Sequence, residues 1–200
     1  MPLNEDDVTA AIEVLQKNNV ESVAVCLMHS YANNVHEARV AEMIRAALPD
    51  ISVSISGDVA PEMREFERFC TACANAYVQP KMTTYLLRLE KRLKEKGLNC
   101  PLLMMLSGGG LTDIATAATF PIRLVESGPA GGALFAASIA LENGLSDVVS
   151  FDMGGTTAKI CLIDNGTPQT SRTFEVARVY RHKKGSGTPV WIPVIDMVEI

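Results

Sequence analysis

The sequence predicts an α/β fold, a mixed sheet with flanking helices. Apolar residues recur at helical spacing in two N-terminal segments, and a short apolar run typical of a buried strand follows each of them. A longer helical pattern occupies the middle of the chain. After residue 146 the pattern changes to strands joined by glycine-containing turns, so helices and strands share one chain.

The N-terminal part is predicted to contain two helix-strand units. The helices are identified by apolar residues every three or four positions, and the strands by short apolar or alternating runs. In order, these elements are a helix capped by Asn4, a strand at 22–28, a helix that starts at Asn33 or Asn34 and ends at Pro49, and a strand at 51–55.

Residues 61–97 have a helical pattern almost throughout. Proline removes a backbone donor from a helix interior, so Pro80 predicts a break between two helices, and Gly97 is the stop signal. Shorter elements follow: a strand at 102–106, a glycine turn at 107–110, a helix at 112–118, a strand at 122–125, a helix of small residues at 130–142 opened by Ser127-Gly128-Pro129, and strands at 148–151, 158–163 and 170–180, with Asp164-Asn165-Gly166 as a hairpin turn.

Composition excludes several classes of protein. A net charge of -5 leaves no basic surplus to bind a nucleic acid backbone. The apolar stretches are shorter than the about 20 residues that a membrane-spanning helix needs, and the acidic start is wrong for a signal or transit peptide. Five cysteines, an odd number, favour the reducing cytoplasm over a disulfide framework. Cys70 and Cys73 form a CxxC without metal-ligand spacing and are predicted to be buried structural thiols.

The strongest chemical signal is the segment Asp152-Met153-Gly154-Gly155-Thr156-Thr157 between two predicted strands. Adjacent glycines allow a tight turn whose amides approach a phosphate without obstruction by Cβ, and the threonines add hydroxyl donors. Asp152 at the strand end is placed to bind magnesium through a water molecule. A plain tight turn explains the same residues, so the loop alone leaves both interpretations open.

The preceding segment favours the phosphate loop. A helix of small residues, a turn and then Asp-x-Gly-Gly-Thr resembles the connecting helix and second phosphate loop of the actin-like (ribonuclease H-like) ATPases, which include sugar kinases and heat-shock chaperones. Several motifs together resemble the N-methylhydantoinase A family, which includes 5-oxoprolinase and the acetone and acetophenone carboxylases. They are Arg64-Glu65-Phe66-Glu67-Arg68, Thr71, Asn75 to Pro80, Ser107-Gly108-Gly109-Gly110-Leu111, Pro121, Ser127 to Gly132, and Asp152 to Thr157, with His29 to Asn33 and His36-Glu37 near the start.

This resemblance implies ATP and magnesium as cofactors, and activation of a cyclic amide or carbonyl oxygen by phosphorylation before hydrolysis or carboxylation. Asp152 would then be catalytic and hold magnesium, and Gly154, Gly155, Thr156 and Thr157 would bind the β- and γ-phosphates. The substrate stays open among hydantoins, 5-oxoproline and ketones. Where oxoprolinases commonly have Ser-Thr-Asp, this chain has Thr157-Ala158-Lys159, which favours the hydantoinase or carboxylase branches.

Relatives in this family begin with another Asp-x-Gly-Gly-Thr loop, which the chain lacks. We therefore expect an internal fragment or split subunit with a partial fold, in which residues 1–144 form the C-terminal part of a first lobe and 145–200 the start of a second. Such a chain would be inactive alone and would need a complementary subunit or lobe. The alternative is a non-catalytic binding or assembly module that keeps the fold.

Three further groups each have two interpretations. His29 and His36 with Glu37 are candidate metal or substrate ligands, although loop or cap hydrogen bonds explain them as well. Arg64 and Arg68, one helical turn apart, suit either an anionic substrate or a solvated salt-bridged face. The basic segment 183–187 is predicted to be a solvated turn.

Overall fold

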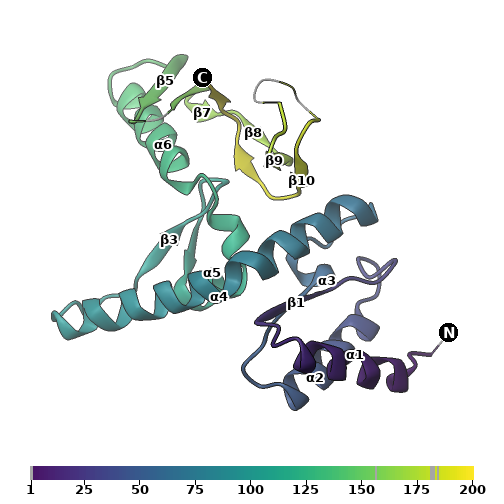
Figure 1. The fold of residues 1–200 in the computed structure, drawn as a ribbon. Coiled ribbons are helices and arrows are strands. Elements are labelled where there is room, and N and C mark those ends of the chain that lie inside the picture. The colour runs from purple at the N-terminus through teal and green to yellow at the C-terminus, as the bar shows by residue number, and fades with distance from the viewer. Residues whose placement is uncertain (1, 156, 181–182, 184) are drawn as a thin grey trace.

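A long central helix organises the structure. The computed structural model describes residues 2–155, 157–180, 183 and 185–200. Helix α4 (Glu65–Glu95) spans 31 residues, with the N-terminal helix-strand unit on one side and the C-terminal strands on the other (Figure 1). The parallel and antiparallel strand pairs expected from the sequence are present, divided among several small sheets.

The N-terminal unit contains two helices and a parallel strand pair, as predicted. Helix α1 (Glu5–Lys17) is capped by Asn4, whose side chain accepts a hydrogen bond from the Asp6 amide at 3.2 Å, which confirms that cap. Strand β1 (Ser22–Val25) pairs in parallel with β2 (Ser52–Ile55), and α2 (Val35–Ala47) connects them. The core beneath consists of Val25, Ala41, Ile44, Ile51, Val53 and Ile55.

A buried network of two charged residues and a hydroxyl ties this unit to α4. Glu37 of α2 is fully buried, and its carboxylate accepts hydrogen bonds from the Leu27 amide at 2.7 Å, the Ser56 hydroxyl at 2.7 Å and the Gly57 amide at 2.8 Å. Ser56 and Gly57 open the short helix α3 (Ser56–Val59). The carboxylate therefore joins α2 to the carboxyl ends of both parallel strands.

Arg68 of α4 is the third member of this network. We call Glu37, Ser56 and Arg68 together the Arg68 network. Its guanidinium is also fully buried and donates to the Ser56 hydroxyl at 3.1 Å and the Leu27 carbonyl at 3.1 Å. Both earlier interpretations of Arg68, an anion-binding residue or part of a solvated face, are wrong, because its donors are used inside the protein. Arg64 is exposed and pairs with Glu67 at 3.3 Å.

Pro80 does not break the central helix. Helix α4 continues through it, contrary to the prediction of two helices. Proline removes one backbone hydrogen bond, but side chains on both sides of it hold the helix to its neighbours. Gln79 donates to the Thr119 carbonyl at 3.1 Å and Thr83 donates to the Ala118 carbonyl at 3.1 Å. Tertiary contacts thus override the local signal.

The segment after α4 differs from its prediction at one element. Strands β3 (Leu103–Met105) and β4 (Leu111–Asp113) form an antiparallel hairpin, and α5 (Ile114–Thr119) follows. The strand predicted at 122–125 is wrong, because Pro121–Leu124 forms a 3₁₀ helix, η1. Its backbone is held from two sides, by the Asn75 side chain accepting from the Ile122 amide at 3.2 Å and by Ser107 donating to the Arg123 carbonyl at 2.6 Å.

The C-terminal part contains one helix and several short strands. Asn165 and Gly166 adopt left-handed φ values of 49° and 73° between β6 and β7, which confirms that hairpin turn. The single strand predicted at 170–180 is wrong, since β8 and β9 pair with different partners. The elements are α6 (Ser127–Glu142), β5 (Val148–Met153), β6 (Ala158–Asp164), β7 (Thr167–Pro168), β8 (Thr170–Ser171), β9 (Phe174–Val176), β10 (Thr188–Val190), β11 (Val194–Ile195) and β12 (Val198–Glu199).

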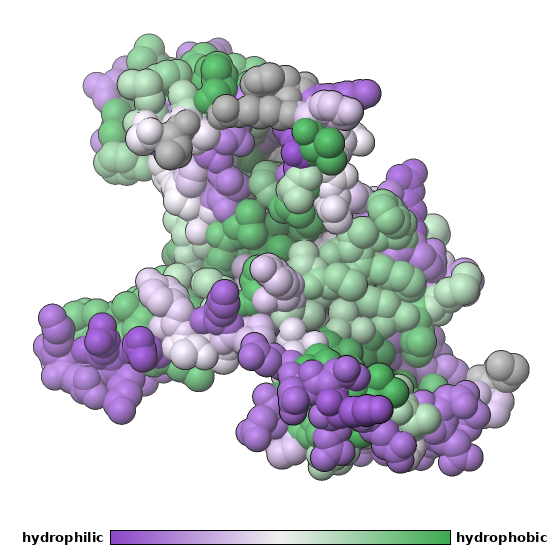
Figure 2. All heavy atoms as spheres, viewed as in Figure 1, coloured by the Kyte–Doolittle hydropathy of each residue, from purple (hydrophilic) through white to green (hydrophobic). Residues whose placement is uncertain are grey.

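The sheet β12-β6-β5 has one packed face and one open face. Cys161 and Ile163 of β6 pack against Ala130, Ala133 and Ala137 of α6. The opposite face exposes large apolar side chains of β5, β6 and β12, and Figure 2 shows hydrophobic residues among hydrophilic ones in the region of β5 at the top of the view. They include Val149, Phe151, Met153, Leu162 and Val198. An apolar sheet face of this kind is typical of a surface that packs against another body.

We expect replacement of Arg68 by Met to lower the free energy of unfolding by about 3 kcal/mol, because the Leu27 carbonyl, the Ser56 hydroxyl and the Glu65 carboxylate lose their buried cationic donor. Urea unfolding followed by circular dichroism measures this change. Arg64→Met, four residues earlier in the chain and exposed, is the control and should change stability by less than about 0.5 kcal/mol. Equal effects of the two substitutions on the free energy of unfolding would show that the Arg68 network does not make this contribution to stability.

The open apolar face predicts self-association of the isolated chain. Sedimentation velocity at increasing concentration should show species larger than the monomer, and replacing both Val149 and Phe151 by Ser should reduce them, because those side chains lie on the open face. A monomer that binds no hydrophobic dye over the same range would contradict this expectation.

Candidate functional site

The Asp152 loop (residues 152–157) closes the hairpin of β5 and β6. The two strands pair from Val148 opposite Ile163 to Met153 opposite Ala158, and Asp152 lies opposite Lys159. Across the turn, the Gly154 amide donates to the Thr157 carbonyl at 3.1 Å. Asp152, Gly154 and Gly155 are exposed and Thr157 is half-buried. Thr156, also predicted to bind phosphate, lies outside the described residues.

The glycines of the loop are not explained by backbone conformation or by packing. Neither Gly154 nor Gly155 has a left-handed φ, so the sterically demanding turn expected from the sequence is not the reason for them. A Cβ at Gly155 would meet no described atom within 4 Å, and at Gly154 the nearest would be the Thr157 carbonyl oxygen at 3.9 Å. By contrast, Gly109 has φ +87° and a Cβ there would lie 2.9 Å from Leu134. A side chain would therefore make an ordinary contact at Gly154 and meet no described atom nearby at Gly155.

The N-terminal turns of α6 approach the Asp152 loop at Gly132. A Cβ at Gly132 would lie 4.0 Å from Oδ2 of Asp152, and one at Gly128 would meet no described atom within 4 Å. Glycine inside a helix costs about 1 kcal/mol relative to alanine, and α6 also contains Gly131, where a Cβ would lie 3.8 Å from Met105. The approach of Asp152 to Gly132 thus brings together the two motifs that the sequence separates by about twenty residues.

An ion pair that was not predicted from the sequence joins the two motifs. Lys159 of β6 donates to Glu126, the residue that precedes α6 and has a left-handed φ of 60°. Both side chains are largely buried, with 16% and 26% exposed. The signal available in the sequence was that Lys159 directly follows the loop and that Glu126 opens the small-residue segment.

The donor set around Asp152 suits magnesium held with a phosphate. Magnesium in phosphoryl-transfer sites is commonly bound by one or two carboxylates together with phosphate oxygens and water. Asp152 provides one exposed carboxylate beside the loop amides. Within the part of the chain that the structure describes, no group of three or more His, Cys, Asp or Glu side chains could hold a metal ion by itself. Any magnesium here would depend on the phosphate for its other ligands.

His29, His36 and Glu37 do not form a common site. Glu37 is committed to the Arg68 network, and His36 is exposed at the start of α2. His29 has a left-handed φ of 60°, and its backbone amide donates to the Glu65 carboxylate at 3.1 Å. The loop hydrogen bond predicted for His29 is therefore made by its backbone, and its imidazole stays 71% exposed.

The cysteines and the basic segment also have defined positions. Cys73 is exposed and Cys70 half-buried, so the expectation of two buried thiols is wrong for Cys73. Burial, together with the neighbouring Cys73 and Glu37, raises the pKa of Cys26 to about 12. In the segment 183–187, the Gly185 amide donates to Glu175 at 2.7 Å, and Lys184 lies outside the described residues.

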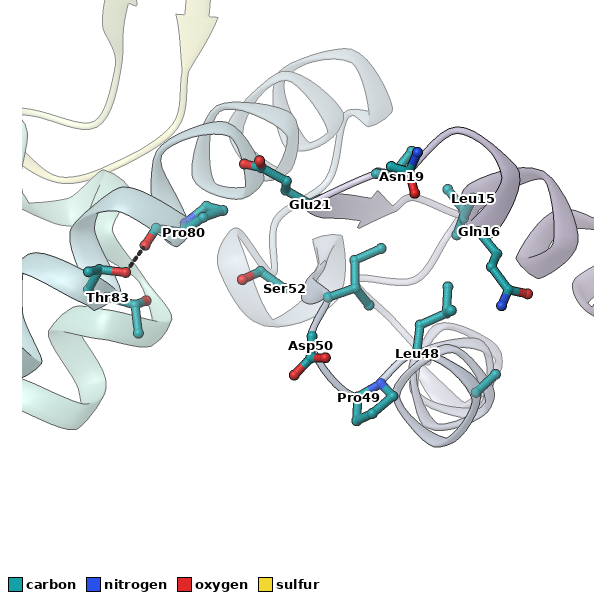
Figure 3. A pocket seen from close by; sticks show the side chains of 14 residues that line it. Leu15, Gln16, Asn19, Glu21, Leu48, Pro49, Asp50, Ser52, Pro80 and Thr83 are labelled. Atoms are coloured by element: carbon teal, nitrogen blue, oxygen red, sulfur yellow. Dashed lines mark hydrogen bonds between the residues drawn. The ribbon is translucent and has the colours of Figure 1, made fainter.

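A separate cavity of about 610 Å³ lies at the amino ends of β1 and β2 (Figure 3). Its walls include Leu15, Val20, Ile51, Pro80 and Thr83. In open α/β sheets ligands bind outside the carboxyl ends of strands, and this cavity is at the opposite end. It is also remote in the chain from the Asp152 loop. We assign it no function.

Comparison with known proteins matches nearly the whole chain to one family. The profile described as "Hydantoinase/oxoprolinase" matches residues 68–200, and "Hydantoinase/oxoprolinase N-terminal region" matches residues 1–48. The caprolactamase subunit alpha of Pseudomonas jessenii is 33% identical over 88% of this chain and 25% of its own length. An uncharacterised protein of Methanocaldococcus jannaschii is 38% identical over the whole chain and 30% of its own length.

Two solved structures have the same fold over the whole chain. The nucleotide-free structure of acetone carboxylase superposes with a TM-score of 0.83 at 24% identity, and the chain covers 27% of it. The ATP-dependent caprolactamase of Pseudomonas jessenii superposes with a TM-score of 0.79 at 28% identity, with 28% covered. The chain thus spans less than a third of the length of these relatives.

None of the helices in the described part of the chain combines the length and the apolar composition of a membrane span.

The thiols offer a test of the local packing. At pH 8 iodoacetamide should modify the exposed Cys73 well before Cys26, because a pKa of about 12 leaves Cys26 almost wholly protonated and only the thiolate reacts. Between pH 7.5 and 9 the rate at Cys26 should rise about tenfold per pH unit, since its thiolate fraction does. Mass spectrometry of the modified peptides measures both rates. Urea-unfolded protein is the control, and similar rates in the folded protein would contradict the described burial.

Proposed function

Because this chain belongs to the hydantoinase/oxoprolinase family, we propose that its Asp152 loop is a phosphate-binding loop of an ATP-dependent enzyme. That enzyme would activate a cyclic amide or a carbonyl compound by phosphorylation, for hydrolysis or carboxylation. One observation carries the proposal: the Asp152 loop lies against Gly132 of α6, and neither a left-handed φ nor a close contact of the missing side chain explains Gly155. A phosphate needs a position without a side chain, because amides can reach its oxygens only where no Cβ intervenes.

The relatives support the choice of ATP and of the substrate class. The caprolactamase structure is described as ATP-dependent, and the acetone carboxylase structure as part of an ATP-dependent carboxylation. One of these enzymes is named for a cyclic amide and the other for a ketone. In both classes the carbonyl oxygen would take the γ-phosphoryl group of ATP, with ADP as the leaving group and loss of a proton from the amide nitrogen or from the α-carbon of the ketone. A small cyclic amide or ketone is therefore the substrate class that we propose.

Each loop residue has a proposed role. Asp152 positions magnesium through a water molecule, and the amides of Gly154 and Gly155 hold the β- and γ-phosphates with the hydroxyls of Thr156 and Thr157. Catalysis of phosphoryl transfer depends almost entirely on positioning and charge stabilisation, and these groups supply both.

The five cysteines are free, in keeping with the proposed cytoplasmic location.

A partner completes the proposed site. Several relatives are named as subunits, for example the acetone carboxylase beta subunit of Xanthobacter autotrophicus. We propose that a complementary subunit or lobe faces the loop and supplies the remaining contacts to the nucleotide. Residues 1–144 then belong to a first lobe and 145–200 to a second, as the sequence predicts.

A non-catalytic binding or assembly module is the second candidate, favoured by the open apolar sheet face. The two candidates differ in nucleotide binding. An enzyme part should bind magnesium-ATP, even if weakly, whereas an assembly module should show no affinity above background.

We expect Gly155→Val to reduce the affinity of the chain for magnesium-ATP at least tenfold, because the added side chain enters the phosphate space. Wild-type affinity should be in the millimolar range, about -4 kcal/mol, because only one side of the phosphates is held. Titration followed by ³¹P NMR measures such weak binding. The thermal midpoint should not change, since a Cβ at this position meets no described atom within 4 Å.

Gly110→Val is the matched control, because Gly110 is exposed and a Cβ there makes an ordinary contact with Leu106 at 3.6 Å. It should leave ATP affinity unchanged. Wild-type chain without ATP binding would refute the proposed function. Equal affinities of the wild type and Gly155→Val would refute the assignment of the loop.

A further inference from the structure

Lys159 is the one cationic side chain near the Asp152 loop in sequence. No other Lys or Arg occurs between Arg123 and Arg172, a stretch that includes all of α6, β5 and β6. In the β5-β6 ladder Lys159 lies directly opposite Asp152. Side chains of directly opposed residues in an antiparallel pair are on the same face of the sheet. Lys159 and Asp152 therefore share a face.

That face is the one packed against α6. Cys161, two residues after Lys159 on the same strand, and its partner Ser150 lie on this face, and Cys161 packs on the alanines of α6. Asp152 approaches Gly132 of α6, and Lys159 donates to Glu126 at the start of that helix. The Lys159 side chain thus lies on the same face as Asp152, between the loop and the start of α6, with 16% of it exposed.

The ion pair itself is weak evidence for a stabilising role. Two charges removed from water lose hydration energy that their mutual attraction only partly recovers. Glu126 moreover adopts a left-handed φ of 60°, which is unfavourable for a residue other than glycine. The Lys159–Glu126 pair is largely buried, and the backbone of Glu126 is strained, so the pair contributes little net stability to the contact between α6 and the sheet. This indicates that the pair has another role.

The charges beside the Asp152 loop identify that role. Asp152 and Glu126 are acidic and Lys159 is basic, so these three side chains carry a surplus of negative charge. A phosphate placed there is repelled by both carboxylates unless cations offset them. Magnesium at Asp152 would supply one cation. Lys159 is the cation that the segment between Arg123 and Arg172 provides.

Resting on the proposed function, we infer that Lys159 contacts the bound phosphate and that Glu126 is its partner only in the absence of nucleotide. Phosphate then replaces Glu126 as the acceptor of the Lys159 ammonium. Glu126 competes with the phosphate, and its carboxylate keeps the ammonium at the edge of the loop until nucleotide arrives. The pair would thus make the loop selective for an anion strong enough to displace a carboxylate.

Breaking the pair from its two sides should have opposite effects on affinity. Lys159→Met should weaken binding of magnesium-ATP to the full chain at least tenfold, because the phosphate loses its cation. Glu126→Gln should strengthen binding about threefold, because a competing anion is removed. Lys159→Arg, which keeps the charge, should retain affinity within about threefold of the wild type. Titrations by ³¹P NMR measure all four proteins.

An exposed pair on α4 provides controls with the same changes of charge. Lys94 pairs with Glu90 at 3.0 Å, far from the loop in sequence, and Lys94→Met and Glu90→Gln should leave ATP affinity unchanged. Thermal unfolding identifies variants that fail to fold, and for those the titration with Lys159→Arg decides the role of the cation.

The outcomes separate this inference from the proposed function. A wild-type chain that does not bind magnesium-ATP refutes the proposed function and the inference with it. Wild-type binding with equal weakening by Lys159→Met and Glu126→Gln shows that the pair is only structural and overturns the inference alone. Wild-type binding that Lys159→Met leaves unchanged also overturns it, and the loop assignment stands.

Discussion

The placement of α4 depends on the buried contact between Arg68, Ser56 and Glu37. A guanidinium and a carboxylate without access to water must have their hydrogen bonds satisfied inside the protein, which leaves few arrangements of the segments that carry them. Glu37 binds the Leu27 amide and the Ser56 hydroxyl, and Arg68 binds the same hydroxyl and the Leu27 carbonyl. Strand ends, α2 and α4 are therefore joined at one point. The direction of the long helix follows from it.

From α4 the constraint passes to the C-terminal part through polar side chains on one helix face. Thr71 accepts from the Trp191 amide at 2.8 Å, and Asn75 binds the Ser54 hydroxyl and the backbone around η1. Ser107 in turn links the Arg123 carbonyl to the Ile195 amide, next to the strands that pack on α6. Arg68, Thr71 and Asn75 belong to motifs by which the family was identified. In this structure their described contacts are hydrogen bonds to other parts of the same chain.

The Asp152 loop lies at the end of this chain of contacts and has a different character. Asp152, Gly154 and Gly155 are exposed, and the ion pair beside the loop joins Lys159 of β6 to Glu126, which precedes α6. Buried hydrogen bonds hold the surrounding elements in place, and the exposed loop can present its backbone amides to a ligand. The apolar face on the other side of the same sheet suits a further lobe or subunit, because water would otherwise contact large side chains there.

The sequence by itself determined the local elements and the family. Helical spacing predicted α1 and α2, Asn165-Gly166 predicted a hairpin turn, and the order of motifs predicted the hydantoinase/oxoprolinase fold, because each of these signals lies within a few consecutive residues. The tertiary structure alone decided that α4 continues through Pro80, that 121–124 is a 3₁₀ helix, that Arg68 is buried, and that Lys159 meets Glu126. Those outcomes depend on partners 12 to 47 positions away, such as Ser56 for Arg68 and Asn75 for Ile122, and no local pattern records such distances.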